Sequence, residues 1–184
     1  MRYSFPYITA KYTSEPVTLD EAREWLRLDI PGYEAEDTTV ASLIESAIDY
    51  VEKECNISLG VSTYQWYTEC LPCEIKDSAY VKSIVSIEEE GDAGFTAIDD
   101  SNYTLIKTGE RSSRIKWKSD FSSSAESYRV NFTAGFDEGE IPPRLLMAVR
   151  TLVSKWYDNR NDTVEEKKTM VDRILSAFRI PYAG

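Results

Sequence analysis

The sequence DTTVASLIESAIDYVEKEC, residues 37–55, carries the clearest periodic signal in the chain. Its apolar residues recur at alternating spacings of three and four positions, which places them on one face of an α-helix. These residues are Val40, Leu43, Ile44, Ala47, Ile48, Val51 and Cys55. Because a helix is stabilised mainly by packing its apolar face, the flanking sequence must supply partners for it.

A shorter helix is predicted on the N-terminal side, at residues 17–28 (VTLDEAREWLRL). Thr18 and Glu21 have the spacing of a capping box, in which each side chain accepts a hydrogen bond from the backbone of the other residue. Residues 1–16 are rich in Tyr and Pro and are predicted to form an irregular arm, packed on its own domain or on another surface. The apolar face of the helix holds Ala22, Trp25 and Leu26.

Two further helices are predicted towards the C-terminus. The first, residues 141–160, opens with two prolines, which a helix tolerates best in its first turn. The second, residues 162–184, begins with another capping box at Thr163 and Glu166 and is stopped by Pro181. Their apolar faces contain Leu146, Val149, Leu152, Val153, Trp156 and Tyr157 in the first helix, and Met170, Val171, Ile174, Leu175 and Phe178 in the second.

Between these helical regions, from about residue 61 to residue 135, the apolar period changes. Short runs rich in Val, Ile, Thr and aromatic residues alternate with turn sequences such as EGDAG (90–94) and DFSSSAES (120–127). This pattern predicts five or six antiparallel strands that form a small sheet or barrel.

The order of these segments predicts an α+β fold, because helices and strands are segregated along the chain. We expect a four-helix bundle built from residues 17–60 and 141–184, with residues 61–140 inserted as an antiparallel β subdomain. The residues expected to pack the helices together are Trp25, Ile44, Ile48, Val51, Leu152, Trp156 and Tyr157.

The charge of the chain limits its partners. It has 32 acidic and 21 basic residues, for a net charge of −11. Such a surface repels phosphate backbones, so specific or tight nucleic-acid binding is not expected, although DNA could pass nearby without being gripped. No stretch of 18 apolar residues and no signal-peptide pattern is present, which predicts a cytosolic protein without a membrane span.

The composition also argues against common catalytic sites. There is no histidine, which removes the most frequent general base and any Ser-His-Asp or Cys-His nucleophile. Neither a phosphate-binding loop nor a dinucleotide fingerprint occurs, and the carboxylate pairs fall in turn sequences. We therefore predict no catalytic residues, no cofactor and no metal.

The CLPC motif at Cys70 and Cys73 is the one pattern typical of redox or zinc chemistry. It follows a strand-like run rather than opening a helix, whose N-terminus would lower a thiol pKa. Zinc would need four ligands, and only Cys55 remains. We favour a structural reading and keep a small cysteine-based redox or metal-binding protein as an alternative.

Five segments in this order resemble the head-tail connector (adaptor) proteins of tailed bacteriophages and prophages. The resemblance runs from about Pro16 to Pro181, and its best markers are FTAGF at 132–136, the following IPP, and a helix that ends in WYDNR. The segments are 17–56, TYQWY at 63–67, 81–105, RVNFTAGF at 129–136, and 141–160.

The resemblance implies a structural protein of the virion neck, assembled in the cytoplasm of the host bacterium and without enzymatic activity. It implies a homo-oligomeric ring, typically dodecameric, beneath the portal protein. The ring would extend the DNA channel and offer a platform for a stopper or tail-completion protein. A role as such a stopper or tail-completion protein is the second alternative.

The apolar, proline-ended tail FRIPYAG suggests where the portal would bind. We expect the last helix and tail, from about residue 173 to residue 184, to dock there, and deletion of 179–184 to abolish portal binding without unfolding the chain. The residues expected in this contact are Arg173, Phe178, Arg179, Ile180, Pro181 and Tyr182. The acidic β turns would face a neighbouring component or the channel.

Overall fold

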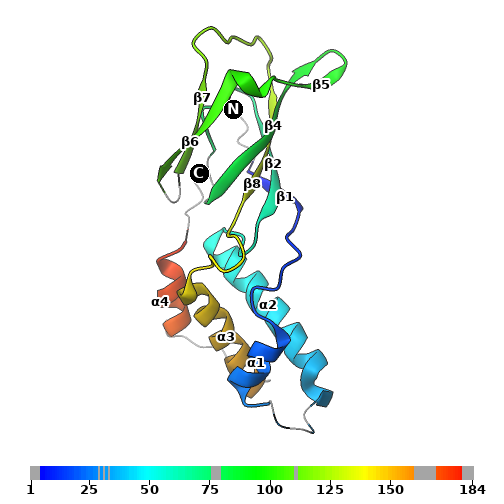
Figure 1. The fold of residues 1–184 in the computed structure, drawn as a ribbon, viewed down its shortest axis with the longest axis vertical. Helices are drawn as coiled ribbons and strands as arrows, with labels where there is room; N and C mark the ends of the chain where they lie inside the picture. Colours follow the sequence, from blue (N-terminus) through cyan, green and yellow to red (C-terminus); the bar gives the residue numbers. More distant parts are fainter. Residues whose placement is uncertain are drawn as a thin grey trace. The chain divides into compact units, whose positions relative to one another are not determined.

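The structure is a computed structural model, and it describes residues 5–28, 30, 32, 34–75, 80–109, 112–159 and 169–179 (Figure 1). The chain divides into two compact units. The helical unit comprises Ser14–Leu59 and Glu138–Arg179, and the β unit contains residues 60–137 together with residues 5–13 of the N-terminal arm.

In the helical unit, α1 (Leu19–Leu26) begins at the predicted capping box, with Thr18 as the N-cap and Glu21 closing the box. The helix ends where Arg27 adopts a left-handed conformation (φ 59°). After the short 3-10 helix η1 (Glu34–Glu36), α2 spans Asp37–Cys55, the predicted range, and ends at a left-handed Asn56. Both helices therefore end at a left-handed residue, which is a common C-terminal signal.

The remaining helices are α3 (Pro143–Asp158) and α4 (Met170–Ser176). The α2 helix packs against the other three, and α3 packs against α1 and α4. The predicted capping box at Thr163 and Glu166 lies outside the described residues. The described helix α4 starts later, because an extended Thr169 caps it and forms a box with Asp172. The predicted start of the last helix therefore stays a prediction.

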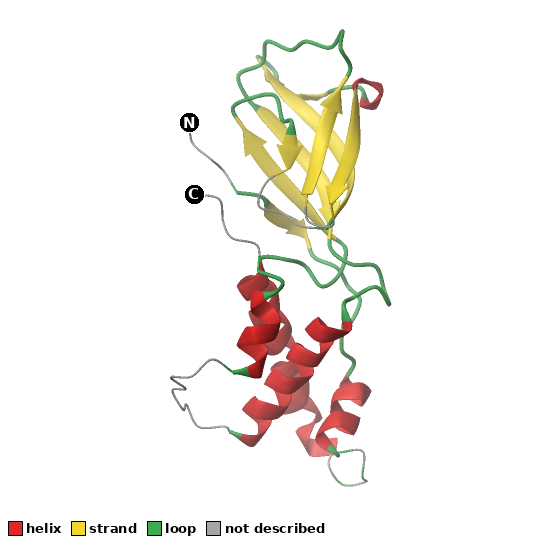
Figure 2. Cartoon of the chain, turned by 90° about the vertical axis from the view of Figure 1, so that its left-hand side faces the viewer, coloured by secondary structure: helices red, strands yellow, loops and turns green. Residues whose placement is uncertain are grey.

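In the β unit, eight described strands form two antiparallel sheets (Figure 2). The five-stranded sheet has the order β1-β2-β8-β4-β5, and the three-stranded sheet has the order β3-β7-β6. The strands are β1 Tyr7–Ala10, β2 Ser62–Thr68, β3 Glu74–Ile75, β4 Val81–Gly91, β5 Gly94–Ala97, β6 Tyr103–Gly109, β7 Ser112–Trp117 and β8 Tyr128–Ala134. A 3-10 turn, η2 (Asp100–Asn102), precedes β6. These strands form no closed barrel, whereas the predicted α+β class is confirmed.

One core joins the two sheets. The alternate residues of β8 that face inward are fully buried, and Tyr64 of β2 stacks on Phe132 with ring centroids 5.4 Å apart. The buried members of this core are Ile75, Val81, Ile87, Ile98, Ile115, Tyr128, Val130, Phe132 and Ala134. Because both sheets contribute, each turns one face inward and leaves the other outward.

The N-terminal arm is more regular than predicted. Residues 7–10 pair with β2 as an edge strand, with Tyr7 opposite Gln65. Farther along, the Tyr12 N–H donates to Ser62 Oγ over 3.3 Å, and the Tyr12 ring lies so close to Gly60 that a Cβ there would meet its Cγ at 2.3 Å. A glycine is therefore needed at position 60 to seat the arm on the β unit.

Candidate functional site

Strand alternation turns a continuous row of polar side chains to the outer face of the five-stranded sheet. On β8, Tyr128, Val130 and Phe132 face the core, so Arg129, Asn131 and Thr133 face outward. Register then places Gln65 and Tyr67 of β2, and Ser86 and Glu88 of β4, beside them. We call this surface the polar sheet face; its outward residues are Tyr7, Thr9, Thr63, Gln65, Tyr67, Ser83, Ser86, Glu88, Glu90, Phe95, Ala97, Arg129, Asn131 and Thr133.

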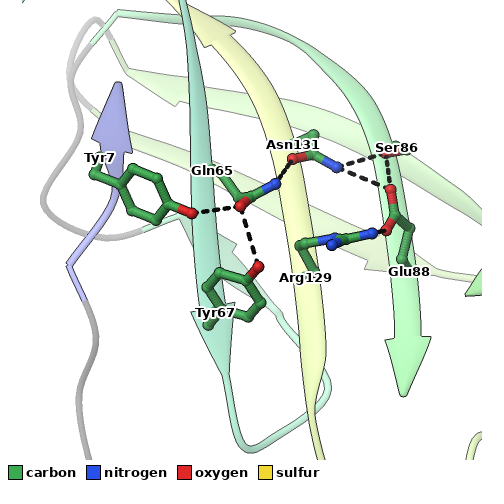
Figure 3. A network of polar contacts seen from close by, with 7 residues as sticks. All are labelled: Tyr7, Gln65, Tyr67, Ser86, Glu88, Arg129 and Asn131. Atoms are coloured by element: carbon green, nitrogen blue, oxygen red, sulfur yellow. Dashed lines mark hydrogen bonds and ion pairs between the residues drawn. The ribbon is translucent and has the colours of Figure 1, made fainter. Parts of the chain in front are cut away.

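A hydrogen-bond network crosses four strands of the polar sheet face (Figure 3). Gln65 Nε2 donates to Asn131 Oδ1 over 2.8 Å, and Asn131 Nδ2 donates to Ser86 Oγ and Glu88 Oε1 over 2.9 Å each. The Tyr67 hydroxyl donates to Gln65 Oε1 over 3.1 Å, and the Tyr7 hydroxyl binds the same oxygen. The network ties the arm strand β1 to the centre of the sheet.

At one end of this network Arg129 is fixed from several sides. Its Nε lies 2.6 Å from Glu88 Oε2, and its guanidinium lies 4.5 Å from the ring centroid of Phe95. Tyr67 packs edge-on to the same Phe95 ring, with centroids 5.8 Å apart. Hydrogen bonds to Tyr67 and Glu88 raise the pKa of Arg129, which favours the charged guanidinium in this ion pair.

The polar groups of this face satisfy one another, which suits a rigid contact surface better than a catalytic centre. Three of its fourteen outward residues, Glu88, Glu90 and Arg129, are charged, and two of these pair with each other. Like-charged chains repel less where a surface lacks charge. The polar sheet face is therefore a surface on which an acidic protein can approach another protein.

The two acidic turns of the β unit meet in space. The β4–β5 hairpin and the loop before β8 enclose an open hollow of about 570 Å³, lined by Glu89, Glu90, Asp92 and Glu126 and by serines 122–124. Ser123 Oγ donates to Glu89 Oε2 over 2.6 Å, which holds the loop against the hairpin. The sequence indicated these turns separately and did not show that they adjoin.

A second hollow lies on the helical unit. Its volume is about 390 Å³, and it is lined by Glu21, Glu24, Trp25, Arg27 and Arg150. Arg150 reaches from α3 to Glu21 over 3.1 Å. Trp25, expected to pack the helices, is instead 47% exposed beside this hollow. The helical period placed Trp25 with Ala22, but α1 is only eight residues long and buries Ala22 alone.

The other residues expected to pack the helices lie as follows. The side chains of Ile44, Ile48, Val51 and Leu152 are buried. Trp156 and Tyr157 are half-buried, and Trp156 meets Tyr50 edge-on with centroids 6.0 Å apart.

The expected portal contact is described only in part. Arg173 is exposed, Phe178 is half-buried, and Arg179 forms an ion pair with Glu54 of α2. Ile180, Pro181 and Tyr182 lie outside the described residues. The α4 helix itself is anchored, because Val171 and Leu175 are buried and Cys55 Sγ lies 3.7 Å from the Leu175 carbonyl oxygen.

The cysteines form no disulfide. Cys70 and Cys73 are exposed in the segment between β2 and β3, and Cys55 is buried. Cys73 Sγ lies 3.6 Å from the Leu71 carbonyl oxygen. In the described ranges, no three His, Cys, Asp or Glu side chains come together as they would to hold a metal ion. Nor does any described helix have the length and apolar character to span a membrane.

Comparison with known proteins shows which family this chain resembles. Residues 16–102, a little under half of the chain, match the family model of phage gp6-like head-tail connector proteins. The predicted resemblance to this family is confirmed. The part that matches the connector model includes α1, α2 and the strands from β2 to β5. No curated protein matches the sequence.

Solved structures resemble this chain over nearly its whole length. A chain from the neck of an empty gene transfer agent particle, computed with C6 symmetry, has a TM-score of 0.77 at 20% identity, covering 98% of this chain and 99% of that chain. A chain from a native gene transfer agent virion has a TM-score of 0.78 at 19% identity, with the same coverage. A chain from the native neck computed with C12 symmetry has a TM-score of 0.70 at 17% identity, covering 97% and 98%. At these low identities, the TM-scores show that the chains share a fold.

Proposed function

We propose that this chain is the subunit of a structural head-tail connector, located in the neck of a phage-like particle. The observation that carries the proposal is the match of residues 16–102 to the gp6-like connector family. The likeness in fold to chains from necks of gene transfer agent particles supports it over the full length. The connector would extend the DNA channel and present a platform for a stopper or the tail.

A non-enzymatic role is part of the proposal. The family is one of structural connectors, and the sequence has no histidine to act as a general base. In the polar sheet face, Glu88 and Arg129 bind each other, which suits a structural role. The exposed hollows are lined by charged and hydroxyl side chains that would suit contacts with another protein.

We propose a ring of twelve copies that binds the portal protein above and a stopper or tail-completion protein below. The related necks were computed with C6 and C12 symmetry, both of which are compatible with twelve positions. Genomic DNA would cross the ring without specific binding, because a net charge of −11 repels phosphates.

The portal contact is proposed for the C-terminal end, from Arg173, Phe178 and Arg179 to the tail residues Ile180, Pro181 and Tyr182. Two features support this placement. Burial of Val171 and Leu175 fixes α4 on the helical unit, and the ion pair between Arg179 and Glu54 fixes the point from which the tail departs. A short tail that starts from a fixed point loses less entropy on binding than one that starts from a mobile point.

Co-sedimentation of the purified chain with assembled portal tests the proposal. We expect the chain to sediment with portal in a saturable ratio and to stay in the supernatant alone. If portal does not retain the chain while a separate stopper or tail component does, the chain is a stopper or tail-completion protein.

The cysteine-based alternative has its own test. The Cys70→Ser, Cys73→Ser double variant should bind portal as the unaltered chain does, because both thiols lie outside the proposed contacts. Zinc bound in a fixed ratio, and lost in that variant together with portal binding, would instead favour a metal-binding role.

A further inference from the structure

The outer face of the three-stranded sheet differs in charge from the rest of this acidic chain. Register sets Thr104 opposite Lys116 and Ile106 opposite Arg114, and all four side chains are exposed. Ser113 and Ile115 on β7 point into the core, which confirms that Arg114 and Lys116 point outward. We call Glu74, Thr104, Ile106, Arg114 and Lys116 the basic sheet face, because its two cations outnumber its one acid.

The two cations of the basic sheet face are available to a partner. Among the described residues, neither forms an ion pair, whereas Lys82 and Arg129 elsewhere in the β unit pair with Asp137 and Glu88. Glu74 is the acid that strand pairing sets opposite Arg114. Beside the cations, Ile106 is 39% exposed and adds an apolar contact. Exposed Arg and Ile flanked by polar residues form a surface suited to an acidic protein segment.

The same unit carries the complementary surface. Asp92 at the tip of the β4–β5 hairpin and Glu126 in the loop before β8 are exposed and line the hollow of about 570 Å³. Glu89 and Glu90 line it too, and both bind serine hydroxyls of that loop. These hydrogen bonds fix the loop against the hairpin and so maintain the shape of the hollow. Asp92 and Glu126 lie at its surface.

The strands of the basic sheet face and the β4–β5 hairpin lie on opposite sides of the β unit. Figure 1 shows β6 and β7 on the left of the unit and the β5 hairpin on its right. A ring is built from a heterologous contact, which needs two different and complementary surfaces on each subunit. A basic surface on one side and an acidic hollow on the other meet this requirement, and they bring acidic chains together without like-charge repulsion.

We propose that the basic sheet face of one subunit receives the acidic β4–β5 hairpin of a second copy, with Arg114 and Lys116 pairing with Asp92 and Glu126 of the neighbour. This inference rests on the proposed ring and names the surfaces that close it. The contact is electrostatic and exposed at its rim, so it weakens as salt rises.

A charge-exchange experiment tests the contact. One variant is Arg114→Glu with Lys116→Glu, and the other is Asp92→Lys with Glu126→Lys. All four positions are exposed, so circular dichroism should show folded chains. Each variant alone places like charges on both sides of every contact. We expect the number of rings formed on portal, counted by electron microscopy at equal concentration, to fall about tenfold or more for each variant.

The equimolar mixture of the two variants is the decisive sample. Alternating subunits then present opposite charges at every contact. We therefore expect the number of rings to return nearly to that formed by the unaltered chain. A variant that carries all four substitutions should also assemble. The control matched to Arg114→Glu, Lys116→Glu is Lys53→Glu with Arg144→Glu, which makes the same change in net charge on exposed helix positions and should leave rings intact.

The outcomes distinguish a wrong contact surface from the absence of a ring. If the unaltered chain forms rings and both charge variants do as well, or if the mixture fails to recover, the contact is wrong and the connector role stands. If the unaltered chain forms no ring at any concentration, the ring and the contact are both wrong. If rings persist in Arg114→Glu, Lys116→Glu but DNA retention falls, the basic sheet face binds DNA instead.

Discussion

Glu52 Oε1 on α2 accepts a hydrogen bond from the backbone N–H of Leu59 over 2.8 Å. The Glu52 side chain is only 8% exposed. The bond therefore secures the chain as it leaves α2 and the left-handed Asn56. A buried carboxyl group in this position supports the local backbone.

Replacing Glu52 by Ala should lower the free energy of unfolding by about 1–3 kcal/mol, because the Leu59 N–H loses its partner in a buried site. Urea denaturation measures the loss. Glu45→Ala, on the exposed face of the same helix, should change stability by no more than about 0.5 kcal/mol. Equal losses in the two variants would show that the Glu52 bond contributes nothing specific.

The pairing of Arg129 with Glu88 should show coupling. Arg129→Met leaves a half-buried carboxylate without its cation, and we expect a loss of about 1–2 kcal/mol in unfolding free energy. The double variant Arg129→Met, Glu88→Met should lose less than the sum of the single changes, because it removes both charges. Strictly additive losses in a double-mutant cycle would contradict the network drawn in Figure 3.

Asp172 should make stability depend on pH. Hydrogen bonds from the Thr169 N–H and hydroxyl lower its pKa below 3.8. A lowered pKa means that the folded state favours the carboxylate, so its stabilisation is present above about pH 4 and is lost as pH falls further. The stability difference between the unaltered chain and Asp172→Asn should therefore shrink between pH 7 and pH 3. A difference that stays constant would show that the carboxylate charge has no such role.

Deleting residues 180–184 should abolish binding to portal and leave the fold unchanged. Arg179 is kept in this variant because its ion pair with Glu54 belongs to the helical unit. Co-sedimentation measures binding, and circular dichroism measures folding. Arg179→Ala is the comparison variant, and it should weaken binding less than the deletion does. If the deleted chain binds portal as fully as the unaltered chain does, the portal contact lies elsewhere on the chain.

Capping boxes and apolar periodicity correctly predicted the helices whose ends are determined by residues within the helix or next to it. The Thr18 and Glu21 capping box and the apolar period of α2 gave the correct helices, because capping and periodicity are encoded within one helical turn or face. The last helix shows the limit of prediction from such local signals. Thr163 and Thr169 both precede an acidic residue at capping-box spacing, and the described helix starts after Thr169, where Val171 and Leu175 can be buried.

The polar sheet face could not be found by the same reasoning. Uncharged residues at alternate positions of β2 and β8 were visible in the sequence, but they are also what a solvated strand shows. Only the pairing of Gln65 with Asn131, between strands 66 residues apart, turns them into a network. The β1 strand was missed for a related reason: all four residues are exposed, so no apolar period marks it.

The most direct test of the connector role is electron microscopy of DNA-filled capsids that lack this protein, mixed with the purified chain. We predict a ring of additional density at the portal vertex, absent when the chain is omitted and absent with the 180–184 deletion. Capsids that stay bare at that vertex, with portal competent to bind another neck protein and the chain folded, would contradict the connector role.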